Sequence, residues 1–356
     1  MDEKKEVQQR ILIEPNASEK ATEDEFYSIL RLIAPGTNIR AGLNGILKAG
    51  KGAIIAIENE WLYPLVDGGF RLNSKFTPQK LIELSKMDGA IILANDLKRI
   101  VSANALLTPD SRIATSETGT RHKAAERTAK QAATLVLAVS ERRNEINLYY
   151  KNLKYHISDS GELLRNANEQ IQMLEKQREL FDRAVKKLSG FELRNYPSFE
   201  QAIHAIQKGY MVKKIASSLQ KYVIELGKES ALLKTRLKEL IADVESETNL
   251  VVKDYTQVDL KKSLAFFEEF SYDDLLDKEK VRNALTLGNP LDKFVIKGWR
   301  ILSKTGIPEP DIAAIIMSAG TLGKAIHSSS GFYRQILGEE KALLFKSEVD
   351  NLKLNL

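Results

Sequence analysis

Over the first ~150 residues, short apolar runs alternate with amphipathic stretches. Continuous runs of four to six apolar residues indicate buried strands, whereas regular apolar–polar alternation indicates an edge strand. The predicted buried strands are Gly52–Ile57, Ala90–Ala94 and Leu135–Val139, and the predicted edge strand is Glu145–Tyr149. Helices are predicted at about Thr22–Ile33, Thr77–Lys86 and Arg121–Thr134. This alternation predicts an α/β domain, in which helices flank a mixed central sheet.

The pattern changes between about Ser158 and Asp254, where apolar residues recur at i+3 and i+4 among charged ones. Such spacing predicts amphipathic helices that pack together as an all-α bundle or spine. We expect a break at Gly190–Pro197. Further helices are expected at about Phe199–Lys208, Tyr210–Leu226 and Ser230–Glu247. No cluster of carboxylates or histidines here suggests chemistry, so the apolar stripe is interpreted as core packing.

Glycine and proline punctuate the last ~65 residues, which predicts short helices joined by tight hairpins. These helices are expected at Glu309–Ala319, Thr321–Ser328 and Glu339–Leu352. Three domains are therefore predicted: 1–150, 151–290 and 291–356.

Composition narrows the class of protein. The chain has 356 residues, 43% of them hydrophobic and 28% charged, as globular proteins do. It has no cysteine and four histidines, so thiolate metal sites are excluded and a multi-histidine zinc site is not expected. Met1–Glu6 lacks the apolar core of a signal peptide, and no apolar run is long enough to cross a bilayer. A cytoplasmic location is expected, and the net charge of +5 indicates no particular partner.

The candidate chemistry begins at Gly119–Lys123, where Thr120 is suited to cap the helix that follows. Arg121, His122 and Lys123 occupy the first turn, although acidic residues are preferred at that end of the helix dipole. An anion held by the free N–H groups, including that of Ala124, would suit both backbone and side chains. An Arg-His-Lys run is nevertheless more often a solvated surface.

An acidic partner precedes the second predicted strand. Asp88 is suited to bind Mg²⁺ or Mn²⁺, and Gly89 leaves room for a ligand to pass close to the backbone. A carboxylate at a strand end and a cationic helix start are what metal-assisted nucleotide chemistry requires. An Asp-Gly pair is more often a simple turn.

The two segments together carry a family resemblance. Lys86-Met87-Asp88-Gly89-Ala90-Ile91-Ile92-Leu93, followed by Ser116-Glu117-Thr118-Gly119-Thr120-Arg121-His122-Lys123-Ala124-Ala125-Glu126-Arg127, resembles the paired signature of the diadenylate cyclase family. The resemblance extends through Ser140–Asn144 and the helical middle to Gly298–Lys304. It therefore covers essentially the whole chain.

The resemblance implies condensation of two ATP molecules into cyclic di-AMP by two facing protomers of an octamer, with the helical spine in its middle. Asp88 would hold Mg²⁺ or Mn²⁺ and activate the ribose 3′-hydroxyl, with Arg121 and His122 as its catalytic partners. The implied nucleotide-binding residues are Gly89, Ala90, Leu107, Thr120, Arg121, His122, Lys123, Ala124 and Ser140. The last domain would be a helix-hairpin-helix module that binds branched DNA and modulates the cyclase.

The chain departs from the family pattern at three places. Lys123 and Ala124 replace the usual arginine and threonine, and Lys123 keeps the charge without the planar fork. The last hairpin has only Gly338 where the family has two glycines, and Glu339 and Glu340 follow it. The candidate DNA-binding residues are Gly320, Gly323, Lys324, Gly338 and Lys341.

Two alternatives to the DNA-modulated cyclase remain open. The chain is a scaffold that senses ATP and binds DNA structures, with weak or no cyclase activity, or it is a cyclase without a DNA response. The change at Lys123 favours the first alternative, and the hairpin's missing glycine favours the second.

Overall fold

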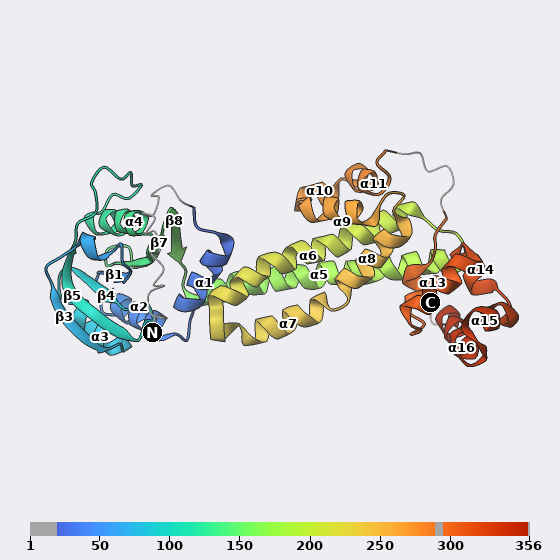
Figure 1. Ribbon diagram of the computed structural model, residues 1–356, viewed down its shortest axis with the longest axis horizontal. Helices are drawn as coiled ribbons and strands as arrows, with labels where there is room; N and C mark the ends of the chain where they lie inside the picture. The colour runs from blue at the N-terminus through green and yellow to red at the C-terminus, as the bar shows by residue number, and fades with distance from the viewer. Residues whose placement is uncertain (1–19, 289–294, 355–356) are drawn as a thin grey trace, which may run out of the picture. The chain divides into compact units, whose positions relative to one another are not determined.

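The computed structural model describes residues 20–288 and 295–354, which form two compact units (Figure 1). One unit contains the residues up to Asn166 together with Lys221–Ala231, and the other contains Ala167–Gln220 together with the residues from Leu232 onward. Met1–Glu6, on which the signal-peptide expectation rests, lies outside the described residues. Within the described ranges, no helix is long and apolar enough to cross a membrane.

An eight-stranded mixed sheet forms the centre of the first unit (Figure 1). Its strands are β1 (Ala53–Ile57), β2 (Val66–Asp67), β3 (Phe70–Lys75), β4 (Ala90–Leu93), β5 (Arg99–Leu107), β6 (Val136–Ser140), β7 (Glu145–Tyr150) and β8 (Leu153–Ile157). The order is β2-β5-β4-β1-β6-β7-β8, and β3 also pairs with β5. Among the strands of the described residues, only β1 and β4 pair in parallel, and the other pairs are antiparallel. The predicted mixed sheet flanked by helices is therefore confirmed.

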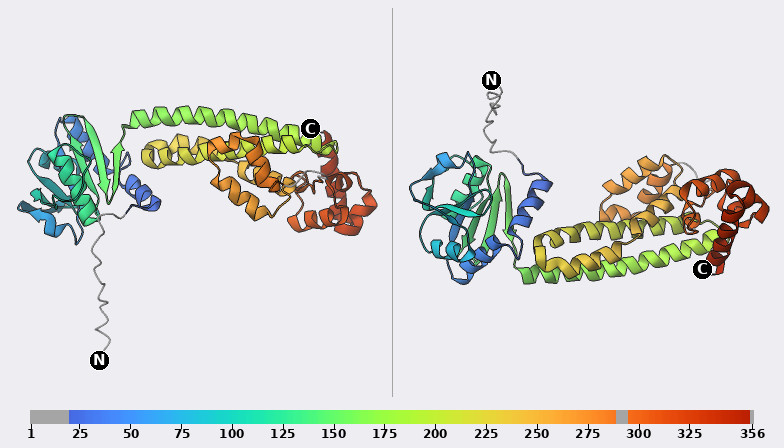
Figure 2. Two further views of the ribbon diagram at one scale, coloured as in Figure 1. Left: turned by 90° about the horizontal axis from the view of Figure 1, so that it is seen from above. Right: turned by 60° about the horizontal axis from the view of Figure 1, so that its bottom comes forward.

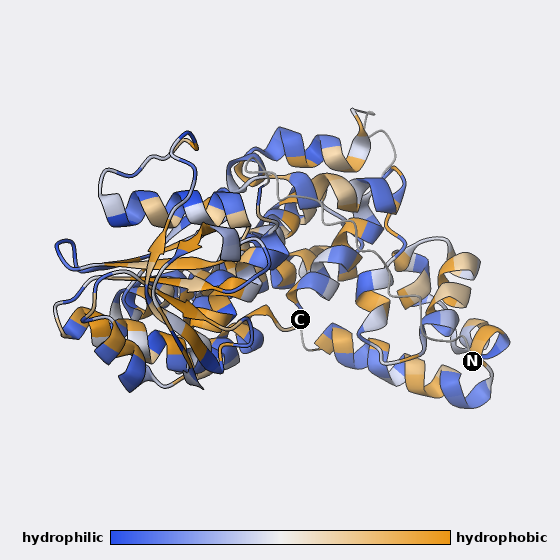
Figure 3. Cartoon of the chain, turned by 60° about the vertical axis from the view of Figure 1, so that its left-hand side comes forward, coloured by the Kyte–Doolittle hydropathy of each residue, from blue (hydrophilic) through white to orange (hydrophobic). Residues whose placement is uncertain are grey.

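Helices cover both faces of this sheet, which Figure 3 shows as an apolar layer between amphipathic helices. One face is covered by α1 (Glu23–Ile33), α2 (Asn38–Lys48) and α3 (Pro78–Leu84), and the other face is covered by α4 (Thr120–Ala132). Successive strand residues point to opposite faces of the sheet. Ile55 therefore packs in the apolar core beneath α1, α2 and α3, and Ile54 packs in the apolar core beneath α4. Because both faces are buried, the central strands read as unbroken apolar runs.

The predicted edge position of Glu145–Tyr149 is wrong, because β8 pairs with β7 on its outer side. Residues Ile146 to Tyr149 are buried, and even Asn147 is only 5% exposed. His156 of β8 lies 3.4 Å from the Asn147 side chain, and a polar contact of this kind compensates for burying an amide. The apolar–polar alternation in Glu145–Tyr149 therefore reflects a polar residue, Asn147, that is buried inside the sheet and is not exposed to solvent.

The second unit is all helical, as predicted, and the long helices α5 and α6 run side by side in it (Figure 2). The helices are α5 (Ser160–Leu193), α6 (Phe199–Leu226), η2 (Gly227–Ser230), α7 (Ala231–Ile241), α8 (Val244–Tyr255), α9 (Leu260–Glu269), α10 (Tyr272–Leu276), α11 (Lys278–Thr286), α12 (Trp299–Ser303), α13 (Glu309–Ala319), α14 (Leu322–His327), α15 (Ser330–Leu337) and α16 (Glu339–Leu354). The ends of α5 and α6 and the η2 turn belong to the first unit. The three predicted C-terminal helices correspond to α13, α14 and α16, with ends within two residues of the predicted ones, whereas α12 and α15 were not predicted.

The break predicted at Gly190–Pro197 is present, since α5 ends at Leu193 and α6 begins at Phe199, but other predicted helix bounds are wrong. Gly190 lies inside α5, and α6 continues through Gly209. A Cβ at Gly209 would lie 2.0 Å from the Thr248 hydroxyl oxygen, so this glycine allows α8 to approach α6 closely. The predicted helix over Ser230–Glu247 instead breaks at Asp243, which has a positive φ of 61°.

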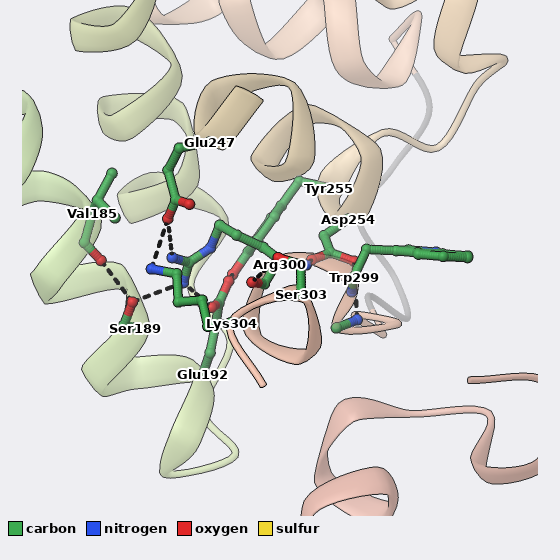
Figure 4. A network of polar contacts seen from close by, with 11 residues as sticks. Val185, Ser189, Glu192, Glu247, Asp254, Tyr255, Trp299, Arg300, Ser303 and Lys304 are labelled. Carbon is green, nitrogen blue, oxygen red and sulfur yellow. Dashed lines mark hydrogen bonds and ion pairs between the residues drawn. The ribbon is translucent and has the colours of Figure 1, made fainter. Parts of the chain in front are cut away.

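A buried polar network joins the start of α12 to α5 and α8 (Figure 4). The Arg300 side chain is fully buried and contacts Glu192, Ser189 and Glu247. Asp254 accepts the first amides of α12, including that of Arg300 at 2.9 Å. A charge removed from water requires such partners, so this network fixes α12 on the spine helices.

Candidate nucleotide site

The N-terminus of α4 is left open for an anion. Gly119 is its N-cap residue, and no side chain caps the helix, so the predicted capping role of Thr120 is wrong: Thr120 is already the first helical residue. The hydrogen-bond ladder begins at Lys123, whose amide donates to the Gly119 carbonyl at 2.9 Å. The first three helical amides therefore have no intrahelical partner, whereas Ala124, predicted to offer its amide, lies beyond them.

A cavity of about 660 Å³ opens at this helix start. It brings together four residues that the sequence singled out, namely Thr120, Arg121, His122 and Ser140. Its other lining residues are Glu117, Thr118, Gly119, Glu141, Arg142 and Arg143. Arg142 and Arg143 had no predicted role, although their position directly after a predicted strand is a signal that could have identified them.

The sheet register brings Asp88 to the same edge as this cavity. β1 pairs with β6 through Ala53 and Val139, and with β4 through Ile54 and Ala90. The start of β1, the end of β6 and the segment before β4 therefore share one edge. Asp88 does not line the cavity, and β4 and β6 lie two strand spacings apart, about 10 Å. Its carboxylate is exposed and has no hydrogen-bond or ion-pair partner among residues 20–288 and 295–354.

Gly52, which was predicted only as the start of a strand, determines where Arg121 can lie. A Cβ at this position would lie 2.0 Å from Nη1 of Arg121 and 3.2 Å from the carbonyl oxygen of Val139. The guanidinium therefore occupies the space that any larger residue at the start of β1 would fill.

Unpaired cations dominate the cavity. The exposed side chains of Arg121, Arg142 and Arg143 form no ion pair with the described part of the chain. By contrast, the buried carboxylate of Glu117 pairs with Lys154, with 2.5 Å between Nζ and Oε1. Three arginines in fork geometry at a helix N-terminus are suited to bind phosphate oxygens.

Burial controls the charge of the ring at the back of the cavity. It lowers the pKa of His122, and the nearby Arg143 and Arg121 lower it further, although Glu117 opposes them. His122 Nδ1 lies 3.0 Å from the Tyr149 hydroxyl. A neutral imidazole is therefore favoured near pH 7.

The other predicted nucleotide-binding residues lie outside the cavity. Gly89 has a φ of 89°, and a Cβ there would lie 2.8 Å from the carbonyl carbon of Asn104, so the close approach of β5 alone explains this glycine. Ala90 and Leu107 are buried beneath α4. Leu106, 60% exposed, is the leucine that faces solvent at this edge.

No group of three or more metal-ligating side chains occurs among the residues that the structure places. Mg²⁺ commonly takes one or two carboxylates and completes its shell with water and substrate phosphates. The exposed carboxylate of Asp88 fits that mode of binding. The described residues offer no site that would hold the metal by protein ligands alone.

Several backbone amides in the two candidate DNA-binding hairpins already have partners within the chain. In the α13–α14 turn, Leu322 donates to the Ile296 carbonyl, Lys324 donates to the Thr321 hydroxyl, and the Cα of Gly323 faces the Asn195 side chain. At the second hairpin, Gly338 has a φ of 80° and donates to Arg334, while Lys341 pairs with Asp311. The Gly320 amide donates to Ile316, and the Lys324 side chain is exposed.

Two family models match the chain: "DisA bacterial checkpoint controller nucleotide-binding" over residues 40–153 and "DisA bacterial checkpoint controller linker region" over 157–293. The chain is 38% identical to the DNA integrity scanning protein DisA of Bacillus subtilis, covering 92% of this chain and 94% of that one. It is 42% identical to the protein of that name from Clostridium kluyveri, covering 83% and 84%. A solved structure of a hypothetical membrane spanning protein from Bacillus cereus is 31% identical, covers 34% of this chain and 62% of its own, and has a TM-score of 0.31.

Proposed function

The chain belongs to the DisA family of diadenylate cyclases, and we propose that it condenses two ATP molecules into cyclic di-AMP and two pyrophosphates. The observation that carries this proposal is the cavity at the start of α4, where unpaired arginines and free helix amides meet. Arg121 and the amides would hold the triphosphate, and Ser140, Arg142 and Arg143 also line the cavity. Lys123 and Ala124, as the next residues of α4, would contribute charge and helix packing.

Asp88 would act on an ATP molecule held by a second copy of the chain. Its carboxylate is exposed, unpaired and outside the cavity of its own chain, but it lies at the same sheet edge. The exposed apolar side chains of Met87 and Leu106 flank this edge, as expected of a surface that meets a partner or an adenosine. Gly89, Ala90 and Leu107 would shape the adenosine site from the backbone. We propose that the oligomer is an octamer in which such surfaces of neighbouring copies face each other in pairs.

Each bond would form when a ribose 3′-oxygen attacks the α-phosphorus of the other ATP and pyrophosphate departs. Asp88 would hold Mg²⁺ or Mn²⁺, which supplies charge neutralisation and favours ionisation of the hydroxyl. Arg121 would stabilise the charge that develops on the phosphate oxygens. His122 would present a ring nitrogen to the reacting groups.

Purified protein incubated with ATP and either metal should yield cyclic di-AMP, and Asp88→Asn should abolish the product. Asp96→Asn is the matched control, since Asp96 caps the β4–β5 turn at the far end of the same strand. When Asp88→Asn is co-expressed with the wild type, activity should fall with the square of the wild-type fraction, because both facing chains must be competent. A linear fall would contradict the shared site. ATP binding without pyrophosphate release would instead identify the chain as an ATP-sensing scaffold.

We further propose that the module of 291–356 contacts branched DNA and modulates the cyclase. The exposed Lys324 and the residues Gly320, Gly323, Gly338 and Lys341 remain its candidate contacts, and because several hairpin amides have partners, side-chain cations would carry most of the binding. Gel shifts with four-way junctions should weaken steeply with salt, and Lys324→Ala should reduce both affinity and salt dependence. Unchanged binding by Lys324→Ala would exclude this residue, and no binding at low salt would leave a cyclase without a DNA response.

A further inference from the structure

A chain of polar contacts runs from the cavity into the core behind His122. The Tyr149 hydroxyl lies 3.0 Å from His122 Nδ1 and donates to Glu117 Oε1 at 2.7 Å. Lys154 pairs with the same carboxylate oxygen. Tyr149 is fully buried on β7, and Glu117 is 8% exposed. The Tyr149 hydroxyl and the Glu117 carboxylate are therefore held in the protein interior, where their partners are protein groups.

The positions of the protons follow from the number of donors. Although burial favours its protonated form, hydrogen bonds from Lys154 and Tyr149 lower the pKa of Glu117, so its ionised carboxylate can only accept. Burial raises the pKa of Tyr149, which therefore keeps its single proton. That proton is committed to Glu117, and the Tyr149 oxygen can only accept from the ring. The nitrogen facing Tyr149 must carry a hydrogen.

We propose that Tyr149 and Glu117 are positioning residues that hold neutral His122 as its Nδ1–H tautomer, leaving Nε2 without a proton at the cavity. Nε2 has no hydrogen-bond partner among the described residues. The charged groups that act on this ring are Glu117, Arg121, Arg143 and Lys154, three cations against one carboxylate, which disfavours the imidazolium.

The consequence concerns the role of His122 and rests on the proposed cyclase function. A neutral ring with a bare Nε2 accepts a hydrogen bond or proton from a hydroxyl or water. It cannot donate to a phosphate oxygen until it is protonated. The structure therefore assigns His122 to the handling of a proton, while Arg121 and the α4 amides neutralise phosphate charge.

The tautomer can be measured without turnover. Full-length protein labelled with ¹⁵N at its four histidines would be examined by magic-angle-spinning NMR, and His122→Gln would identify the signal of this ring. A protonated Nδ1 and a bare Nε2 are expected for the wild type. Tyr149→Phe should shift the ring toward the Nε2–H tautomer. A wild-type signal from Nε2–H would overturn the inference, whether or not the protein makes cyclic di-AMP.

Kinetics test the consequence with a matched pair of variants. Tyr149→Phe should lower kcat by about tenfold or more, as loss of an orienting partner commonly does, with KM for ATP nearly unchanged. Tyr155→Phe is the control. Tyr155 lies on β8, the strand next to that of Tyr149, and it also donates to a buried glutamate, Glu225, at 2.8 Å. Equal kcat values for wild type and Tyr149→Phe, or equal losses in both variants, would overturn the positioning role.

A third variant keeps the test decisive if Tyr149→Phe fails to fold. Glu117→Gln retains a carbonyl oxygen that can accept from Tyr149, so the Nδ1–H tautomer and most of kcat should survive. Glu117→Leu removes that acceptor and should change the tautomer as Tyr149→Phe does. If the Gln and Leu variants show the same tautomer, the inference is wrong.

Discussion

Replacing Arg300 with methionine tests whether the network in Figure 4 fixes α12 to the spine helices. The Arg300 side chain is 0% exposed, and its partner Glu192 is 1% exposed. Methionine keeps much of the apolar stem but removes the charge. Glu192 would then be left in the interior with no cation, although Tyr255 would still donate to it at 2.9 Å.

The magnitude follows from the burial of both partners. Removing one partner of a buried ion pair typically costs about 3–5 kcal/mol, because the other charge loses its compensation. The loss should depend on pH. Burial raises the pKa of Glu192, and the absence of Arg300 should raise it further. A protein with a buried carboxyl of raised pKa is most stable when that carboxyl is protonated. The loss of stability in Arg300→Met should therefore be small near pH 5 and grow as the pH rises and Glu192 ionises.

Trp299 provides a local signal for the assay, since the chain has only one other tryptophan, Trp61. In a Trp61→Phe background, urea unfolding followed by fluorescence would report on the second unit. Arg236→Met is the matched control, because Arg236 is 53% exposed and also contacts two glutamates. Exposed pairs contribute about 0–1 kcal/mol. A loss in Arg300→Met no larger than in Arg236→Met would refute the reasoning.

Three further predictions concern single positions. Hydrogen bonds from the α1 cap and from a lysine lower the pKa of Glu25 to about 2. Its stabilising contribution is therefore present above its unfolded pKa and is lost as the pH falls toward 2. The Tm difference between wild type and Glu25→Gln should shrink over that range. Gly52→Ala should raise KM for ATP by roughly tenfold in steady-state assays, because the new Cβ displaces the Arg121 guanidinium. Gly209→Ala should destabilise the protein by about 1–3 kcal/mol in urea unfolding through its clash with α8, whereas Gly190→Ala, with open space around it, should stabilise it by about 0.5–1 kcal/mol.

The sequence predicted elements best where one local signal was strong. The helix at Glu309–Ala319 has the predicted bounds, because prolines mark its start and Gly320 its end. The buried strands were found because strands covered on both faces read as continuous apolar runs. The strand β3, with its exposed Phe70, carries no such pattern and was missed.

Glycines were the weakest guide, because the same residue serves different purposes. Gly209 was interpreted as a helix break, although it accommodates a facing helix. Gly89 was interpreted as room for a ligand, which stays a prediction, and the structure adds that the backbone of β5 requires a glycine there. Gly52 was predicted only as the start of a strand, since its further purpose depends on the Arg121 side chain, which lies far away in sequence.

By itself, the sequence determined the order of an α/β domain and a helical region, and the cationic start of α4, because these depend on spacing within a few residues. The tertiary structure alone decided what converges on that start. Antiparallel pairing of β6 with β1 brings Ser140 to it, and pairing of β7 with β6 places Tyr149 behind His122. Contacts between residues distant in the chain depend on strand order and register, which local periodicity does not encode.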